Sequence, residues 1–322
     1  MLDDLMTAAQ GLNQTQFHIF IDPRYDQRAY LAPNITYHET ARSKRILVDG
    51  RIKGLVDDES IVLNIGSMPS FIRLPCSVIQ FLLNRYLIDD YSKKGMPYIM
   101  KLRLTLQIWG FRICLKNVDQ YFVPNMVMKD ILLNQGYPDE KIRVIPYKNI
   151  DVVKVETDTD DVKGFLYVAS DEPHKNHINL VKAWKLLGEE GIRPPLYLTI
   201  DDGTELSRFI TSFVKQYGLD IQIKSTLPRE ELMSYYRRVK ALIFPSFFES
   251  FGIPLIEANN FDLPIIAAEL DYVRDFIKPA ETFDPSSPRS IARAVKRFLG
   301  AQDDRFKIIT AKDFVRELEQ YV

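Results

Sequence analysis

Short apolar runs alternate with amphipathic stretches through residues 162–299, and this alternation restricts the fold more than any other feature of the 322-residue chain. Residues 196–200 and 241–244 have the length and composition of buried strands, whereas apolar residues within 177–187 recur at helical spacing. Strands that alternate with helices form βαβ units, whose parallel sheet is covered on both faces. We therefore predict a doubly wound α/β domain over residues 162–322.

The first half alternates in the same way, although less regularly. Phe17–Ile21 and Val78–Leu82 have the character of strands, and residues 101–115 that of an amphipathic helix. Asp151–Asp161 is rich in acids and has no apolar face, so we predict a linker there. The predicted fold class is α/β, with a Rossmann-like domain at residues 1–150 facing the second domain across a cleft.

Composition is that of a soluble globular protein and excludes several classes. Hydrophobic residues make up 46% and charged residues 26% of the chain, and a net charge of -1 gives no field that would attract nucleic acid. Residues 1–150 carry 19 Lys and Arg against 15 Asp and Glu, and the remainder 23 against 28. The first half therefore suits an anionic acceptor or a membrane surface. Chance scatter of charge is the alternative.

Targeting, membrane-spanning and metal-binding patterns are not found in the sequence. The first residues are polar and acidic rather than basic and then apolar, and no apolar run reaches the roughly 18 residues of a membrane span. Cys76 and Cys114 are far apart in apolar surroundings, which is typical of buried free thiols in a reducing compartment. The four histidines show no metal-ligand spacing. We expect a cytoplasmic protein.

The known phosphate-binding loops decide between classes of nucleotide-binding enzyme. G-x-G-x-x-G occurs nowhere in the chain, and neither G-x-x-x-x-G-K-[ST] nor G-x-S-x-G is present. A dinucleotide dehydrogenase, a P-loop phosphotransferase and an α/β-hydrolase are therefore disfavoured.

The segment Glu249–Glu257 offers another kind of anion site. Pro254 suits the first turn of a helix, because its missing N–H has no partner there, and Gly252 lets the backbone come close to a ligand. The free N–H groups and the dipole of that helix would bind a phosphate. Glu249 in the loop and Glu257 in the first turn would then accept hydrogen bonds from sugar hydroxyls. The alternative is that Glu249 caps the backbone and Glu257 is a surface charge.

Residues 245–258, which read Pro-Ser-Phe-Phe-Glu-Ser-Phe-Gly-Ile-Pro-Leu-Ile-Glu-Ala, resemble the E-x7-E signature of the retaining glycosyltransferases of family four, which have the GT-B fold. The likeness continues through residues 259–299. The upstream loop at residues 169–177 is similar to the basic phosphate-binding loop of that family. The resemblance covers the second half of the chain strongly and the first half weakly.

This resemblance implies roles for the matching residues. Lys175 would contact the donor diphosphate, Glu249 the donor sugar and Glu257 the ribose hydroxyls, with Leu227 near the base. Glu249 and Lys175 would act in catalysis, and neither a metal ion nor another cofactor is expected. The expected donor-binding residues are Ser170, Lys175, Leu227, Glu249, Ser250, Phe251, Gly252, Ile253 and Glu257.

Two features depart from the family pattern. Many members carry an Arg at the position of Ala169, so phosphate binding would depend on Lys175 and the helix dipole, helped by His174 if that residue is charged. Members also commonly open with a strand and a glycine-rich loop. This chain opens with a helix and reaches its first strand at Phe17, so that strand and loop are expected to be missing.

The acceptor side is predicted from the first half. Asn84 and Arg85 follow the strand at residues 78–82, where family members often place a His near the reacting sugar; structural contacts at a strand end are the alternative. Residues 82–90 resemble transferases of bacterial surface-polysaccharide clusters, which act on lipid-linked saccharides. Basic and apolar residues between 93 and 116 would rest on an anionic membrane, or else form a core helix with a solvated face.

The sequence therefore predicts a glycosyltransferase that moves a sugar from a UDP-, GDP- or dTDP-sugar to a saccharide, with retention of anomeric configuration. The acceptor would be polyisoprenoid-linked, in O-antigen or capsule-type synthesis on the inner face of the cytoplasmic membrane. Two alternatives remain open. One is a non-catalytic partner subunit that binds sugar nucleotides, and the other is a different GT-B enzyme, such as a nucleotide-sugar epimerase.

Overall fold

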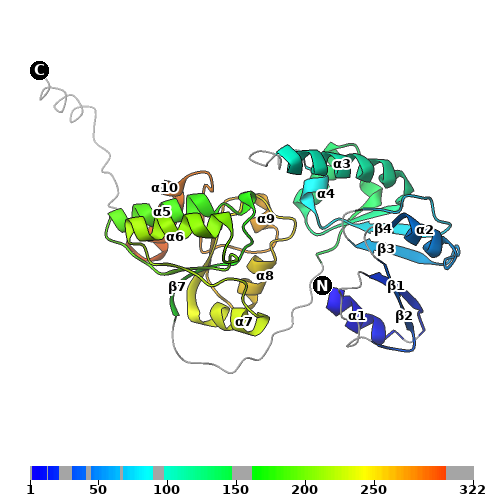
Figure 1. Cartoon of the computed structure of the whole chain (residues 1–322), viewed down its shortest axis with the longest axis horizontal. Coiled ribbons are helices and arrows are strands. Elements are labelled where there is room, and N and C mark those ends of the chain that lie inside the picture. The colour runs from blue at the N-terminus through cyan, green and yellow to red at the C-terminus, as the bar shows by residue number, and fades with distance from the viewer. Residues whose placement is uncertain are drawn as a thin grey trace, which may run out of the picture.

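The computed structural model describes residues 2–12, 14–21, 31–40, 45–65, 68–89, 98–146 and 162–301, so the linker predicted at residues 151–161 lies outside the described part. Two α/β domains follow one another along the longest axis of the molecule (Figure 1). We refer to residues 2–146 as the N-terminal domain and to residues 162–301 as the C-terminal domain.

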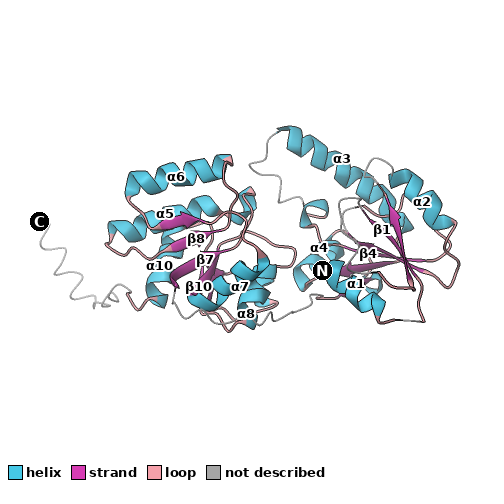
Figure 2. Ribbon diagram, turned by 60° about the horizontal axis from the view of Figure 1, so that its bottom comes forward, coloured by secondary structure: helices cyan, strands magenta, loops and turns pink. Residues whose placement is uncertain are grey.

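The C-terminal domain is a six-stranded parallel sheet between two layers of helices, as the alternating pattern predicted. Its strands lie in the order β12-β11-β10-β7-β8-β9. Helices α5, α6 and α10 cover one face, and α7 and α8 cover the other (Figures 1 and 2). The strands are β7 Val162–Tyr167, β8 Leu196–Leu198, β9 Ile221–Ile223, β10 Val239–Phe244, β11 Ile265–Ala268 and β12 Glu281–Phe283. The helices are α5 His177–Glu189, α6 Glu205–Tyr217, α7 Arg229–Arg238, α8 Ile253–Asn260, α9 Asp271–Arg274 and α10 Pro288–Phe298.

The core of this domain explains why its sequence was the easier half to interpret. The central strands β7 and β10 are buried on both faces, so they are continuous apolar runs such as Phe165-Leu166 and Leu242-Ile243. Helix boundaries follow the expected local chemistry. The side chain of Thr204 accepts a hydrogen bond from Ser207 N–H at the start of α6, and Gly218 ends that helix in the left-handed conformation.

The N-terminal domain holds a four-stranded parallel sheet, β3-β4-β5-β6, and a separate two-stranded parallel sheet, β1-β2. The first described element is the predicted helix, and β1 begins at Phe17 as expected. The sequence analysis did not predict β2 or α2. The elements are α1 Leu2–Gln10, β1 Phe17–Ile21, β2 Ile35–Glu39, α2 Arg45–Lys53, β3 Ile61–Ile65, β4 Ser77–Phe81, the 3-10 turn η3 Arg85–Leu87, α3 Tyr98–Cys114, β5 Gln120–Val123, α4 Met126–Asn134 and β6 Ile142–Val144.

Two separate apolar cores correspond to the two domains. The N-terminal core gathers around Val78, Leu82, Phe111 and Met128, where α3 and α4 meet the four-stranded sheet. The C-terminal core is larger and runs along both faces of its sheet. Within the described ranges, no helix is both long and apolar enough to cross a bilayer.

Candidate functional site

Lys175 and Glu249 meet where the strand order of the C-terminal sheet reverses. From β7 the chain continues outward through β8 and β9, whereas β10, on the other side of β7, leads to β11 and β12. Loops after such neighbouring strands diverge and leave a crevice at their carboxyl ends, where doubly wound sheets bind ligands. Lys175 follows β7, and Glu249 follows β10.

The two side chains form a well-shielded ion pair. Nζ of Lys175 lies 2.9 Å from both carboxylate oxygens of Glu249, with side chains only 16% and 10% exposed. A bidentate pair of opposite charges holds both groups in one orientation, and each charge offsets the desolvation of the other. The ammonium can face an incoming phosphate while the carboxylate keeps lone pairs for hydroxyl groups.

Asn176 fixes the loop that carries Lys175. It takes the left-handed conformation at φ 63° between the 3-10 turn η7 (Pro173–Lys175) and α5. Its buried amide donates to the carbonyl oxygens of Pro245 at 2.9 Å and Pro285 at 2.7 Å, so the loops after β7, β10 and β12 are tied together. Sequence analysis did not assign this role. The signal available was an Asn directly before a helix, since Asn tolerates this conformation better than most residues.

The start of α8 supplies the predicted backbone donors. Gly252 is its N-cap, at φ 68°, in a conformation that favours glycine. Among the described residues, none accepts a hydrogen bond from the N–H of Phe251, Gly252 or Ile253. These free N–H groups and the positive end of the helix make this turn suitable for an anion.

Glu257 lies one turn later than predicted. Because α8 begins at Ile253, its fifth residue is in the second turn of the helix rather than the first. The carboxylate is mostly buried and accepts a hydrogen bond from the hydroxyl of Tyr236 at 3.1 Å. Arg229 approaches it to 4.0 Å from the start of α7. The carboxylate is thus held in place by its own domain.

Ser170 and Leu227 occupy the margins of the same edge of the sheet. Ser170 is exposed in the loop after β7, and its hydroxyl donates to Glu172 at 2.6 Å. Leu227 is half-buried between β9 and α7. Since β9 is two strands from β7, Leu227 lies roughly 10 Å further along the sheet, where the far end of an extended nucleotide would reach.

Ser250 connects this site to the N-terminal domain. Its hydroxyl accepts a hydrogen bond from the backbone N–H of Arg85 at 3.1 Å. Its carbonyl oxygen accepts one from the amide of Asn125 at 2.7 Å, and the same Asn125 caps α4. The backbone N–H of Met126 donates to Asp275 at 3.1 Å. The loop that the sequence predicts to bind the donor is therefore in direct contact with the N-terminal domain, including the predicted acceptor-side residue Arg85.

The predicted acceptor-side residues make structural contacts as well. The side-chain oxygen of Asn84 caps η3 by accepting from Tyr86 N–H. Arg85 pairs with Asp89 at 2.7 Å, and its guanidinium lies 5.1 Å from the ring centre of Phe248. The Arg85 side chain is mostly buried and extends from the N-terminal domain toward the C-terminal domain.

Tyr86 and His174 form a cross-domain contact that sequence analysis missed. The hydroxyl of Tyr86 lies 2.6 Å from Nδ1 of His174, and the imidazole stacks on Phe248 with ring centres 4.4 Å apart. Burial, then the nearby charge of Lys175, lowers the pKa of His174 to about 4. An imidazole with this pKa is neutral at pH 7, so the condition under which His174 would help to bind the phosphate is not met.

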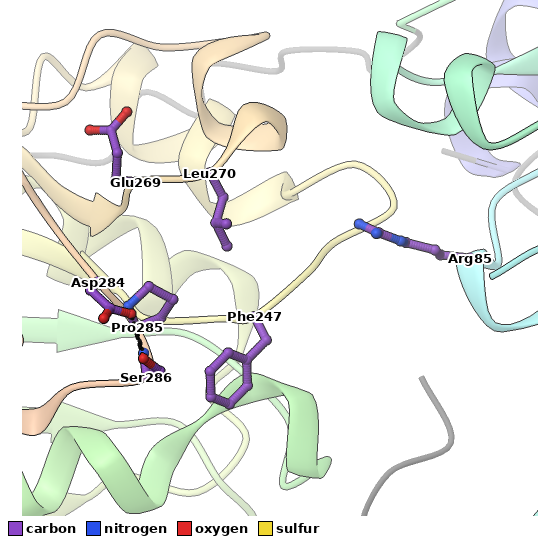
Figure 3. Close-up of a pocket in the computed structure, with 7 residues that line it drawn as sticks. All are labelled: Arg85, Phe247, Glu269, Leu270, Asp284, Pro285 and Ser286. Atoms are coloured by element: carbon purple, nitrogen blue, oxygen red, sulfur yellow. Dashed lines mark hydrogen bonds between the residues drawn. The ribbon is translucent and has the colours of Figure 1, made fainter. Parts of the chain in front are cut away.

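A cavity of about 530 Å³ opens at the domain boundary (Figure 3). Arg85 extends into this region from the N-terminal domain, and the other lining residues come from the loops after β10, β11 and β12. Neither Lys175 nor Glu249 lines it, so it lies to one side of the crevice at β7 and β10. The lining residues are Arg85, Phe247, Glu269, Leu270, Asp284, Pro285 and Ser286.

Solved structures share this architecture. The chain is similar to sucrose-phosphate synthase from Thermosynechococcus elongatus, with a TM-score of 0.63 at 15% identity, over 92% of this chain and 82% of that one. At such identity the likeness shows the fold alone, which is the GT-B fold predicted from the sequence.

Sequence relatives point to the same class. The chain is 27% identical over 160 residues to the O-antigen chain mannosyltransferase B of Escherichia coli, matching 48% of this chain and 41% of that one. It is 24% identical over 219 residues to the O-antigen chain mannosyltransferase RfbU of Salmonella typhimurium, matching 66% of this chain and 60% of that one. The aligned region thus spans less than two thirds of either relative. The family model described as "Glycosyl transferases group 1" matches residues 150–313, about half of the chain. The chain therefore belongs to the glycosyl transferases group 1 family.

Proposed function

We propose that this chain transfers a hexose from a nucleoside-diphosphate sugar to a saccharide acceptor, with retention of anomeric configuration. The observation that carries the proposal is the Lys175–Glu249 ion pair beside the free N–H groups at the start of α8. It combines donors for a diphosphate with an acceptor for sugar hydroxyls, at the switch point where doubly wound sheets bind ligands.

Lys175 and Glu249 can each bind a different part of a sugar nucleotide. The Lys175 ammonium and the N–H groups of Phe251, Gly252 and Ile253 would hold the diphosphate, while Glu249 accepts hydrogen bonds from the sugar. Glu257, already oriented by Tyr236, would receive the ribose hydroxyls. Leu227 would lie near the base. Each of these groups is positioned by its own domain, so little ordering is needed on binding.

In the proposed reaction the acceptor oxygen attacks C1 of the sugar from the face that the diphosphate leaves. The C1–O bond to the acceptor forms as the C1–O bond to phosphate breaks, and the acceptor proton passes to the departing phosphate oxygen. Lys175 and the positive end of α8 stabilise the negative charge that develops on the leaving diphosphate. These groups replace a metal ion in that role, and we propose that none is required.

The names of the relatives suggest where the reaction belongs. Both are mannosyltransferases of O-antigen chains, and mannose is therefore the first sugar to test. We propose a polyisoprenoid-linked saccharide as acceptor, on the inner face of the cytoplasmic membrane, in O-antigen or capsule-type synthesis. The contacts of Arg85 and Asn125 with Ser250 support an acceptor bound on the N-terminal side of the same loop.

A donor screen followed by a transfer assay tests the proposal. Thermal unfolding is recorded with UDP-, GDP- and dTDP-sugars, and the stabilising donor is then supplied, radiolabelled, with lipid-linked saccharide. Transfer that persists in EDTA, with the donor configuration retained in the NMR coupling of the product, is expected. Donor binding without transfer to any acceptor would instead favour the partner subunit. Conversion of the donor sugar without an acceptor would favour an epimerase.

A further inference from the structure

Helix α3 exposes an apolar stripe that no described part of the molecule covers. Five large side chains occur at positions i, i+3, i+7, i+10 and i+14, which places them on one side of a helix. The opposite side packs into the N-terminal core through Leu104, Ile108 and Phe111. The exposed residues are Ile99 at 81%, Leu102 at 52%, Leu106 at 61%, Trp109 at 68% and Ile113 at 44%. Single exposed apolar residues are ordinary, whereas a contiguous row of five indicates a contact surface.

Basic residues border this stripe, and acids are absent from it. At helical spacing, Lys101 and Arg112 lie along one border and Arg103 along the other. Lys116 follows just beyond the helix, and residues 98–118 contain no Asp or Glu. The long stems of Lys and Arg can lie along an apolar layer while their charges reach outward.

We propose that the stripe on α3 docks this protein on the surface of an anionic membrane. An apolar face with Trp and Leu, bordered by Lys and Arg, is suited to the boundary between acyl chains and headgroups, where the charges meet anionic phosphates. A second copy of the chain fits this surface poorly. Two α3 helices packed on each other would bring together borders of like charge with no acid to compensate.

The surface adjoins the predicted acceptor side, and this part of the inference rests on the proposed function. α3 packs against η3, the turn that contains Arg85 and Tyr86. In Figures 1 and 2, α3 lies along the margin of the N-terminal domain with one end toward the C-terminal domain. A lipid-linked saccharide would then reach the crevice from the membrane on which α3 lies.

Tryptophan fluorescence can report docking directly, because the chain has only two tryptophans and they differ in exposure. Trp109 is exposed, whereas Trp184 is 2% exposed and its indole N–H already donates to the carbonyl of Pro194. On addition of phosphatidylglycerol vesicles, we expect the emission to shift to the blue and brominated acyl chains to quench it. Neither change is expected with phosphatidylcholine vesicles or with Trp109→Phe, which leaves only Trp184.

Cosedimentation with the same vesicles tests the stripe by substitution. Leu106→Glu/Trp109→Glu places two charges on the apolar side and should weaken binding to phosphatidylglycerol vesicles at least about tenfold. Lys101→Gln/Arg103→Gln/Arg112→Gln should weaken it by a similar factor, and added salt should have the same effect. Phe209→Glu is the control, because Phe209 is an exposed apolar residue on α6 of the other domain and should leave binding unchanged.

Three results would overturn the proposal. One is binding of the wild-type chain to neither kind of vesicle. The second is equal binding by the Leu106→Glu/Trp109→Glu variant, and the third is a wild-type dimer, seen by light scattering, that this variant dissociates. Donor affinity is measured on the same variants and should equal that of the wild type. A variant that no longer binds membranes but still binds the donor therefore tests this surface alone. A wild-type chain that binds no donor would instead contradict the proposed function.

Discussion

The hydroxyl of Tyr86 in the N-terminal domain and Nδ1 of His174 in the C-terminal domain share a hydrogen bond across 2.6 Å. Burial, with smaller contributions from Glu172 and Glu249, raises the pKa of Tyr86 to about 12, while that of His174 falls to about 4. Near neutral pH the phenol is therefore protonated and the imidazole neutral, so the two groups share one proton-mediated contact and neither carries a charge. It joins the domains directly beside Lys175.

Replacing Tyr86 by Phe should loosen the domains without unfolding either of them. The substitution removes one cross-domain hydrogen bond, worth about 1 kcal/mol, and leaves the ring contacts with Phe248 in place. Small-angle scattering should show a larger mean radius of gyration. Tyr121→Phe is the matched control, because the Tyr121 hydroxyl bonds to Leu115 within one domain. A radius unchanged in Tyr86→Phe, or raised equally in both variants, would contradict this role.

Gly252→Ala should destabilise the C-terminal domain more than Gly203→Ala. Both glycines have positive φ, 68° and 81°, which costs an alanine about 1–2 kcal/mol. A Cβ at Gly252 would also lie 3.1 Å from Cδ1 of Leu255, whereas one at Gly203 would meet nothing within 4 Å. Urea unfolding of the two variants separates backbone strain from this contact. A loss at Gly252 no larger than that at Gly203 would show that the first turn of α8 adapts freely.

Acid should destabilise the protein through His177. Its ring is buried, and neither ring nitrogen has a hydrogen-bond partner among the residues that the structure describes. Burial lowers its pKa from 6.5 to about 3. As the pH falls below 6.5, the His177 side chain therefore binds a proton in the unfolded chain but remains neutral in the folded chain. The free energy of unfolding is therefore unaffected by His177 above pH 6.5, and it declines as the pH falls from 6.5 toward 3.

By pH 5 the protonation of His177 in the unfolded chain should lower the free energy of unfolding by about 2 kcal/mol. We expect the free energy of unfolding of His177→Leu to depend less on pH than that of the wild type between pH 6.5 and 5. Carboxylates whose pKa values are lowered, such as Asp119 and Asp284, titrate below this window. Parallel pH profiles for the two proteins would disprove the assignment.

The sequence predicted the C-terminal domain well because its strands are buried on both faces and its helices are amphipathic. It did not predict β2, since Ile-Thr-Tyr-His-Glu ends on polar residues, or α2, which contains Gly50 and a weak apolar pattern. These elements owe more to tertiary packing than to local preference.

The site was predicted to a similar extent. Lys175 and Glu249 follow from the loop chemistry and the family signature, and the structure brings them into contact. The contacts of Ser250, Tyr86 and His174 join residues 88 to 165 positions apart, so no local pattern could indicate them. The sequence left the charge of His174 open, because that charge depends on burial, which cannot be derived from sequence neighbours.

Calorimetric titration of Lys175→Ala with the nucleotide that stabilises the wild type tests the donor site most directly. Lys185→Ala is the control, since Lys185 lies on α5 and pairs with Glu189 near the surface. We predict that the Lys175→Ala variant binds about 10- to 100-fold more weakly, the loss expected for a charge-assisted contact, and that Lys185→Ala binds like the wild type. Equal affinity in Lys175→Ala and the wild type, or no binding of UDP, GDP or dTDP by the wild type, would contradict a donor site at Lys175 and Glu249.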